Sequence, residues 1–270
     1  MINVQDEYRG LLSGILNGGK EKDDRTGTGT RSVFGRILRH NMGIGFPLLT
    51  AKKIYFNYAI TELLWILQGR DDLFYLHSHG VTYWDDNYKK SGRTDDTLGP
   101  VYGKQLRNFN GVDQLEQILK QIKQEPSSRR IMASLWNPPE LDDMALPPCH
   151  HGFQVYINEG KLSLSWSQRS VDVFLGLPYD IAMYGLLLLM LAKGFGYKPG
   201  ELVCFMGDCH LYNNHLTQAT QYLNRADGKL PTVELKKGLS LTDKVDIPTH
   251  EDISLINYNP ATLIKAPLAT

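Results

Sequence analysis

Residues 181–195 (IAMYGLLLLMLAKGF) constrain the fold more than any other stretch, because they are apolar on almost every side. The segment has helical length and is followed by Gly196, a residue typical of helix ends. Such a helix is stable in water only where the rest of the chain covers it. Its longest wholly apolar run, residues 186–192, is far shorter than the roughly 20 residues that cross a bilayer. The sequence therefore predicts a central core helix and no membrane span.

Three more helices are predicted from apolar spacing. Residues 5–16 and 55–68 show the helical period, and Gly69 follows the second as a helix end. A third helix has one apolar and one polar face, and its apolar stripe consists of Val112, Leu115, Ile118, Leu119 and Ile122. We expect the helix over residues 55–68 to be largely buried and the third helix to face solvent on one side.

The strand signals cluster in the middle of the chain. Residues 131–136, 152–157 and 161–168 are typical of strands, and Asn158-Glu159-Gly160 forms a hairpin turn between the last two. Residues 239–249 read as a polar connection. Since no linker or change in composition divides the chain, we expect one α+β domain over residues 1–270. Its core would be a large mixed or antiparallel sheet packed by helices.

Composition excludes several classes of protein. Lysine and arginine together number 29, as do aspartate and glutamate, which argues against a broad basic surface for a nucleic-acid polymer. The N-terminus lacks the apolar core of a secretory signal, so we expect a cytoplasmic protein. The cysteines, Cys149, Cys204 and Cys209, have no spacing that suits zinc. We therefore expect free thiols and no metal.

Cys149 is the candidate nucleophile. It follows Pro147-Pro148, where the backbone is stiff and cannot continue a helix. Four arginines, Arg25, Arg129, Arg130 and Arg169, could converge on a phosphate dianion, and their field would lower the pKa of a nearby thiol. The alternatives are a cysteine that is merely packed and arginines that are merely solvated.

Acidic residues in apolar surroundings are a second set of candidates. Glu62 lies inside the apolar run 60–65, where desolvation would disfavour its charge and make it a proton carrier. Asp172 and Asp180 flank another apolar run, and such acids are rarely buried without a partner. Residues 207–212 read as a loop after a strand, in which His210 and Tyr212, two residues apart, could hydrogen-bond one ligand group, although such loop pairs are more often structural.

These segments, in this order, resemble the thymidylate synthase family over nearly the whole chain. Each matching motif is short, but together they are very specific. They are residues 24–30 (DRTGTGT), 62–65 (ELLW), 98–105 (LGPVYGKQ), 128–130 (SRR), 146–150 (LPPCH), 168–170 (QRS), 172–178 (DVFLGLP), 207–212 (GDCHLY) and 264–269 (IKAPLA).

The resemblance implies a homodimer that pairs through a sheet face, with a role for each matched residue. Cys149 would attack C6 of a pyrimidine nucleotide, while Glu62, Tyr102 and His150 manage protons and Asp180 reads the base. The residues that bind the nucleotide would be Arg25, Gln168, Arg169, Ser170, His210 and Tyr212, with Arg129 and Arg130 supplied by the partner chain. The pocket for 5,10-methylenetetrahydrofolate would consist of Tyr83, Trp84, Asp172, Leu175, Gly176, Tyr179 and Ala269.

Position 180 departs from the family pattern, which has asparagine after Leu-Pro-Phe to read uracil. Cytosine presents an acceptor at N3 and donors at N4, and a carboxylic acid can satisfy both. Phage deoxycytidylate hydroxymethylases are similar here, because they carry aspartate at this place. We therefore expect dCMP, with ordinary thymidylate synthase activity on dUMP as the alternative.

A second departure concerns the reaction product. Tyr83, Asn87 and Thr270 are polar where the methylating relatives have apolar residues that keep water out, which favours a hydroxymethyl product. Against this, His150 and residues 265–269 look like the methylating enzymes, so a dCMP 5-methyltransferase remains the alternative. A nucleotide- or RNA-binding homologue without catalysis is a remote third reading.

Overall fold

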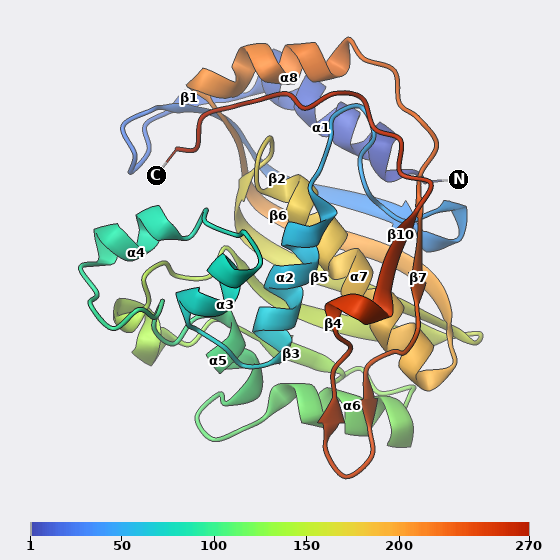
Figure 1. The fold of residues 1–270 in the computed structure, drawn as a ribbon. Helices are drawn as coiled ribbons and strands as arrows, with labels where there is room; N and C mark the ends of the chain where they lie inside the picture. The colour runs from blue at the N-terminus through green and yellow to red at the C-terminus, as the bar shows by residue number, and fades with distance from the viewer. Residues whose placement is uncertain (1, 270) are drawn as a thin grey trace.

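A six-stranded mixed sheet forms the centre of the molecule (Figure 1). The computed structural model describes residues 2–269, so Thr270 lies outside the described residues. The strand order is β1-β2-β6-β5-β4-β3. These strands are β1 (Lys20–Lys22), β2 (Thr30–Asn41), β3 (Met132–Ser134), β4 (His150–Asn158), β5 (Lys161–Asp172) and β6 (Lys198–Tyr212).

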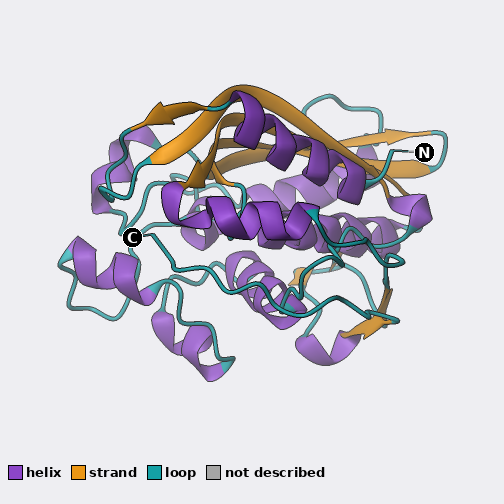
Figure 2. Cartoon of the chain, turned by 90° about the horizontal axis from the view of Figure 1, so that it is seen from above, coloured by secondary structure: helices purple, strands orange, loops and turns teal. Residues whose placement is uncertain are grey.

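Helices cover one face of this sheet, and Figure 2 shows most of them on the same side of the strands. They are α1 (Val4–Gly18), α2 (Phe56–Leu67), α3 (Leu73–Ser78), α4 (Asp85–Ser91), α5 (Tyr102–Arg107), α6 (Gln114–Gln124), α7 (Leu177–Phe195) and α8 (Leu216–Leu223). A two-stranded ribbon, β7 (Thr232–Leu235) with β10 (Ile253–Ile256), and a short hairpin, β8 (Ser240–Leu241) with β9 (Val245–Asp246), complete the fold.

Helix α7 is the predicted core helix. It packs on β5 and β6 from one side and on α2 from the other. By length and composition alone its 19 residues could cross a membrane, but 72% of its most apolar window is buried inside the fold. Gly196 ends the helix in the left-handed conformation, with φ 73°, as the sequence predicts.

The predicted α+β fold is confirmed, but an entirely antiparallel sheet would have been wrong. β5 and β6 pair in parallel, because α7 connects them and carries the chain back across the sheet. The predicted hairpin joins β4 and β5 in antiparallel register, with Glu159 and Gly160 at positive φ in its turn.

Four local expectations are corrected. Val112 precedes α6 and is exposed, because the isolated bridge between Phe109 and Val112 turns the chain before the helix begins. The strand expected over residues 131–136 is limited to β3. Residues 207–212 are not a loop after a strand but the last part of β6, where β2 and β5 pair on either side. Residues 239–249 contain β8 and β9, which pair with each other.

The other sheet face is exposed and partly apolar. Ile37 on β2 lies directly opposite Phe205 on β6, and both side chains are about half exposed. Phe34, Tyr156 and Met132 are also exposed on the strands of this sheet. An apolar surface of this kind on a sheet with only one covered face is typical of a protein interface.

Candidate active site

The turn that carries Cys149 is held from two sides. The Arg169 side chain donates to the carbonyl oxygens of Pro148 and Pro147 at 2.9 and 3.0 Å, and its backbone N–H donates to the Cys149 carbonyl at 2.9 Å. The backbone N–H of Cys149 donates to the Tyr102 hydroxyl at 2.9 Å. Since the two prolines already stiffen the chain, these bonds fix the position of the sulfur.

The acidity of this thiol differs from the expectation. Arg169 and Arg25 both lower the pKa of Cys149, as the sequence predicts, but burial outweighs them and raises it to about 11. Asp180 and Asp172 add to the rise. The thiol is therefore protonated at neutral pH in the ligand-free chain.

Asp180 lies in the first turn of α7, close enough to Cys149 to raise the pKa of its thiol. Its Oδ2 accepts a hydrogen bond from Gln168 Nε2 at 2.8 Å, and Gln168 Oε1 accepts one from Trp166 Nε1 at 3.1 Å. The indole N–H thus fixes which way the Gln168 amide points. Burial raises the pKa of Asp180 to about 7, with Glu62 and Asp172 adding to the effect, so it can hold or release a proton at neutral pH.

Glu62 extends from α2 toward the same place. Its two carboxylate oxygens accept hydrogen bonds from Tyr83 Oη at 2.6 Å and from Trp84 Nε1 at 3.0 Å. Burial raises the pKa of Glu62, and the two hydrogen bonds counteract part of that rise. The predicted proton carrier is therefore a buried carboxyl with both oxygens held.

His150 is buried next to the nucleophile. Its ring stacks on Tyr102 with centroids 4.2 Å apart, and its Nδ1 lies 2.8 Å from the Tyr184 hydroxyl. Burial lowers the pKa of His150 to about 3. The imidazole is therefore neutral at physiological pH, so it can orient groups through hydrogen bonds but does not store a proton.

The predicted phosphate residues divide into two groups. Arg25 and Arg169 lie near the nucleophile, since both lower the pKa of Cys149. Asp24 accepts the backbone N–H groups of Thr26 and Gly29, which shapes the loop that carries Arg25. Arg129 and Arg130 are exposed and directly precede β3, at the opposite edge of the sheet from that loop. Four strand spacings, about 19 Å, separate β2 from β3, so the structure does not bring all four arginines together within one chain.

His210 and Tyr212 lie together near the end of β6, with ring centroids 5.2 Å apart. His210 Nδ1 is 3.3 Å from Asp208 Oδ1, without a hydrogen bond between them. Ser170 on β5 pairs with Asp208 in the adjacent strand. His210 and Tyr212 on β6 therefore lie beside the strand that carries Arg169 and Ser170.

The predicted folate residues lie where the chain enters α7 and around Trp84. Asp172 Oδ1 accepts the N–H groups of Phe174 and Leu175, each at 3.0 Å, while its Oδ2 has no hydrogen-bond partner among residues 2–269. A carboxylate oxygen left free beside aromatic side chains fits a flat heterocycle that carries N–H donors. The remaining predicted residues are Leu175, Gly176 and Tyr179 at the start of α7, and Ala269 in the C-terminal tail.

The C-terminal tail is tied to the body near this site. His215, which is fully buried, lies with its Nε2 2.7 Å from the Pro267 carbonyl oxygen. Its Nδ1 is 3.9 Å from Asp172 Oδ1. The tail is therefore held through a histidine that also neighbours the predicted folate carboxylate.

Sequence reasoning missed Lys52, a buried lysine whose ammonium bonds the Phe174 carbonyl and lies 3.8 Å from the Phe174 ring centroid. Burial lowers its pKa to about 7, and Asp172 opposes that shift. Only a tertiary contact across 122 residues reveals this amine as a neighbour of the site. The sole local signal was a lysine beside an apolar run.

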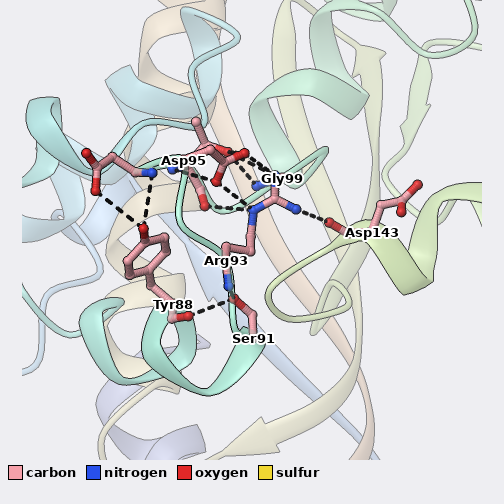
Figure 3. Close-up of polar contacts among 8 residues, drawn as sticks. Tyr88, Ser91, Arg93, Asp95, Gly99 and Asp143 are labelled. Carbon is pink, nitrogen blue, oxygen red and sulfur yellow. Dashed lines mark hydrogen bonds and ion pairs between the residues drawn. The ribbon is translucent and has the colours of Figure 1, made fainter.

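Arg93 was also missed, and it connects two parts of the site (Figure 3). Its guanidinium pairs with Asp95 and donates to the carbonyl oxygens of Thr97 and Asp143, at 3.0 and 2.9 Å. The first two contacts hold the loop after α4, and the third holds the segment that leads to Cys149. Nearby, the Ala145 N–H donates to the Leu98 carbonyl at 2.9 Å. Arg93 therefore joins the loop after α4 to the segment that precedes Cys149.

Within residues 2–269 no cluster of three or more His, Cys, Asp or Glu side chains could hold a metal ion. In a comparison with known protein families, residues 6–270 match thymidylate synthase. That span includes the cysteine turn, the buried acids and the arginine motifs described above. The chain therefore belongs to the thymidylate synthase family, whose enzymes transfer a one-carbon unit from methylenetetrahydrofolate to C5 of a pyrimidine nucleotide.

Proposed function

We propose that this chain is a dCMP 5-hydroxymethylase, which converts dCMP, 5,10-methylenetetrahydrofolate and water into 5-hydroxymethyl-dCMP and tetrahydrofolate. The proposal depends most on the position and the protonation of Asp180. Its carboxyl is close to Cys149, one oxygen is fixed by Gln168, and its pKa is raised to about 7. A nucleophile and a protonatable acid thus flank the space for one base.

The chemistry of Asp180 suits cytosine. A protonated carboxyl can donate O–H to N3 and accept N–H from N4, and an ionised carboxylate can do the same for N3-protonated cytosine. Uracil carries N3–H and O4 instead, so an ionised carboxylate would accept N3–H but meet O4 with its second acceptor oxygen, and both of these oxygens would lack a donor. Each such loss costs about 1–3 kcal/mol, which gives a preference of roughly 10² to 10⁴.

Covalent activation follows from the same pair. As the Cys149 sulfur bonds to C6, the π electrons of the C5–C6 bond move to C5, and Asp180 can neutralise the charge that develops at N3. The thiol proton must leave at this step, and the ionised Asp180 carboxylate can accept it and pass it to N3. The raised pKa of Cys149 makes this transfer costly in the free chain. Bound nucleotide phosphate would keep Arg25 and Arg169 near the sulfur to offset that cost.

5,10-Methylenetetrahydrofolate, when bound, supplies the one-carbon unit that C5 takes up. Asp172 and the aromatic side chains of Trp84, Tyr83 and Tyr179 would hold and orient it. Glu62 would accept the proton that C5 then loses and pass it to solvent. As C5 loses this proton, the bond from the transferred carbon to the folate nitrogen would break and tetrahydrofolate would leave. An exocyclic methylene would then remain on the nucleotide, with Cys149 still attached at C6.

Water would complete the reaction. Its oxygen bonds to the methylene carbon, its proton goes to Glu62, and the C6–S bond breaks as C5=C6 re-forms. Two polar side chains support this outcome, namely Tyr83, whose hydroxyl touches Glu62, and Asn87, which is only partly buried. The second candidate is methylation, and the tail that is bound through Pro267 favours it because such a tail can exclude water.

Mass spectrometry of the product tests the proposal. The enzyme would be incubated with methylenetetrahydrofolate and either dCMP or dUMP, with Cys149→Ala as the control. We expect hydroxymethyl-dCMP from the unaltered enzyme and no product from the control. A methyl product formed with dihydrofolate would favour methylation, and turnover of dUMP alone would contradict the base assignment. Nucleotide binding without turnover of either base would favour a non-catalytic homologue.

The proposal includes a homodimer and a cytoplasmic location. The apolar sheet face around Ile37 and Phe205 suits a second copy of this chain. Such pairing would let the exposed Arg129 and Arg130 of one chain reach the phosphate bound by the other. It would thereby account for arginines that lie far from Arg25 within a single chain.

A further inference from the structure

Both oxygens of the Glu62 carboxylate are held by neighbours in sequence. Tyr83 Oη donates to Oε2 at 2.6 Å and Trp84 Nε1 donates to Oε1 at 3.0 Å. Among the described residues, these are the side chains that donate to this carboxylate. A carboxyl held at both ends cannot rotate freely, so its remaining lone pairs point in fixed directions.

Tyr83 is itself held in place. Its ring lies 6.3 Å from that of Tyr58 and 6.5 Å from that of Trp84, measured between centroids. Tyr58 in turn stacks on Tyr179 at 6.4 Å. An aromatic row, formed by Tyr179, Tyr58, Tyr83 and Trp84, therefore holds the Tyr83 hydroxyl beside Glu62. Because this side chain is already ordered in the folded protein, little further side-chain entropy is lost there when a substrate binds.

The other ionisable groups near Glu62 do not offer a substitute donor. The charge of Asp180 on α7 repels that of Glu62. The Tyr102 hydroxyl accepts the Cys149 N–H and the Tyr184 hydroxyl lies 2.8 Å from His150 Nδ1, and neither hydroxyl bonds Glu62 in this structure. Asp172 and the Cys149 thiol complete the titratable groups around this cluster. Loss of the Tyr83 hydroxyl would therefore leave Oε2 without a donor in a dry environment.

We propose that Tyr83 is a positioning residue, which holds Glu62 in the orientation and ionised form that the proton transfers at C5 require. The assignment rests on the proposed function, because it takes Glu62 as the proton carrier of that reaction. Tyr83 acts through Glu62. The hydroxyl contributes a charge-assisted hydrogen bond, and such bonds favour the ionised form of the acceptor.

Tyr83→Phe tests this, because phenylalanine keeps the ring and removes only the hydroxyl. Tyr58→Phe is the matched control, since it removes a hydroxyl from the same aromatic row without touching Glu62. Infrared difference spectra of the ligand-free protein would follow the C=O band of the protonated acid against pH. Glu62→Gln and Asp180→Asn would assign the bands of the two carboxyls.

We expect the Glu62 band in Tyr83→Phe to titrate about one pH unit higher, a tenfold change in its protonation equilibrium. The kcat–pH profile should shift upward by the same amount on the limb that Glu62→Gln removes, with KM for nucleotide little changed. Tyr58→Phe should leave both curves in place. Identical titrations in Tyr83→Phe and the unaltered protein would overturn the assignment.

The infrared measurement needs no substrate, so it separates this inference from the proposed function. If dCMP is not turned over but the Glu62 band shifts in Tyr83→Phe, the proposed function fails and the contact stands. If dCMP is hydroxymethylated but the Glu62 band and the pH profile stay fixed, Tyr83 is a packing residue and only this inference fails.

Discussion

Asp180 and an asparagine at the same place have nearly the same shape, so the exchange isolates the ionisable group. We expect Asp180→Asn to shift preference from dCMP toward dUMP, because an amide donates to O4 and accepts from N3–H. The ratio of the two kcat/KM values should change by roughly 10²-fold or more. Steady-state kinetics with both nucleotides measure it, and unchanged selectivity for dCMP would count strongly against base reading by this residue.

The same substitution should alter how stability depends on pH. The pKa of Asp180 is raised from 3.8 to about 7. Between these values the unfolded chain has released a proton that the folded chain still holds, so the free energy of unfolding falls as pH rises through this window. The total loss is at most about 4 kcal/mol, because each pKa unit corresponds to about 1.4 kcal/mol.

Asp180→Asn removes this proton linkage. We expect the variant to gain stability relative to the unaltered protein as pH rises from 4 to 7, and the difference to level off above pH 7. Urea denaturation across this range measures it. Parallel stability curves for the two proteins would show that the carboxyl titrates in the same way in both states.

At the scale of elements, the hydrogen bonds of Arg93 join the loop after α4 to the segment before Cys149. We expect Arg93→Ala to free both segments, because the Thr97 and Asp143 carbonyls lose their donor. Hydrogen exchange of the Ala145 amide, which bonds to Leu98, should accelerate about tenfold.

Asp95→Ala is the control for the carbonyl hydrogen bonds of Arg93. It removes the ion pair, which is partly exposed, but leaves the two carbonyl contacts of Arg93 in place. The effect on the Ala145 amide should therefore be much smaller than that of Arg93→Ala. Equal exchange rates in the unaltered protein and Arg93→Ala would show that the two segments are held by other contacts.

What could be predicted from the sequence differs between kinds of element. Helices α2 and α7 were predictable because each is a long apolar run that a glycine ends, and the β4–β5 hairpin because its turn residues are unmistakable. The length of β2 was not, since its exposed residues, among them Phe34 and Ile37, hide the alternation of a half-buried strand. β8 and β9 were missed because two-residue strands leave no period at all.

The features of the candidate site also differ in how far the sequence could predict them. Cys149 and Glu62 stood out because their local surroundings are unusual for their type. The pairing of Glu62 with Tyr83, and of Gln168 with Asp180, depends on segments that meet only after folding. The raised pKa of Cys149 was likewise not predictable, because the sequence shows nearby arginines but not the depth of burial that outweighs them.

At the scale of the whole molecule, the exposed sheet face decides whether the chain works alone. Phe205 lies opposite Ile37 on this face, so Phe205→Asp places a charge in the proposed interface. We expect the variant to sediment as a monomer with its fold intact, while the unaltered protein sediments as a dimer. Phe74→Asp is the control, because that exposed phenylalanine lies on α3, away from the sheet. A dimer that survives Phe205→Asp would place the interface elsewhere.

A dimer with shared sites makes a sharper prediction, because two inactive chains should restore each other. One chain would carry Cys149→Ala, and the other Arg129→Ala with Arg130→Ala. In a mixed dimer, the second chain keeps its own cysteine and receives both arginines from the first, so one site is complete. Random mixing makes half of the dimers mixed, so activity should return to about a quarter of the unaltered value. If Arg129 and Arg130 serve the site of their own chain, the mixture stays as inactive as its components. The two arginines would then have to reach the site across four strand spacings of their own sheet.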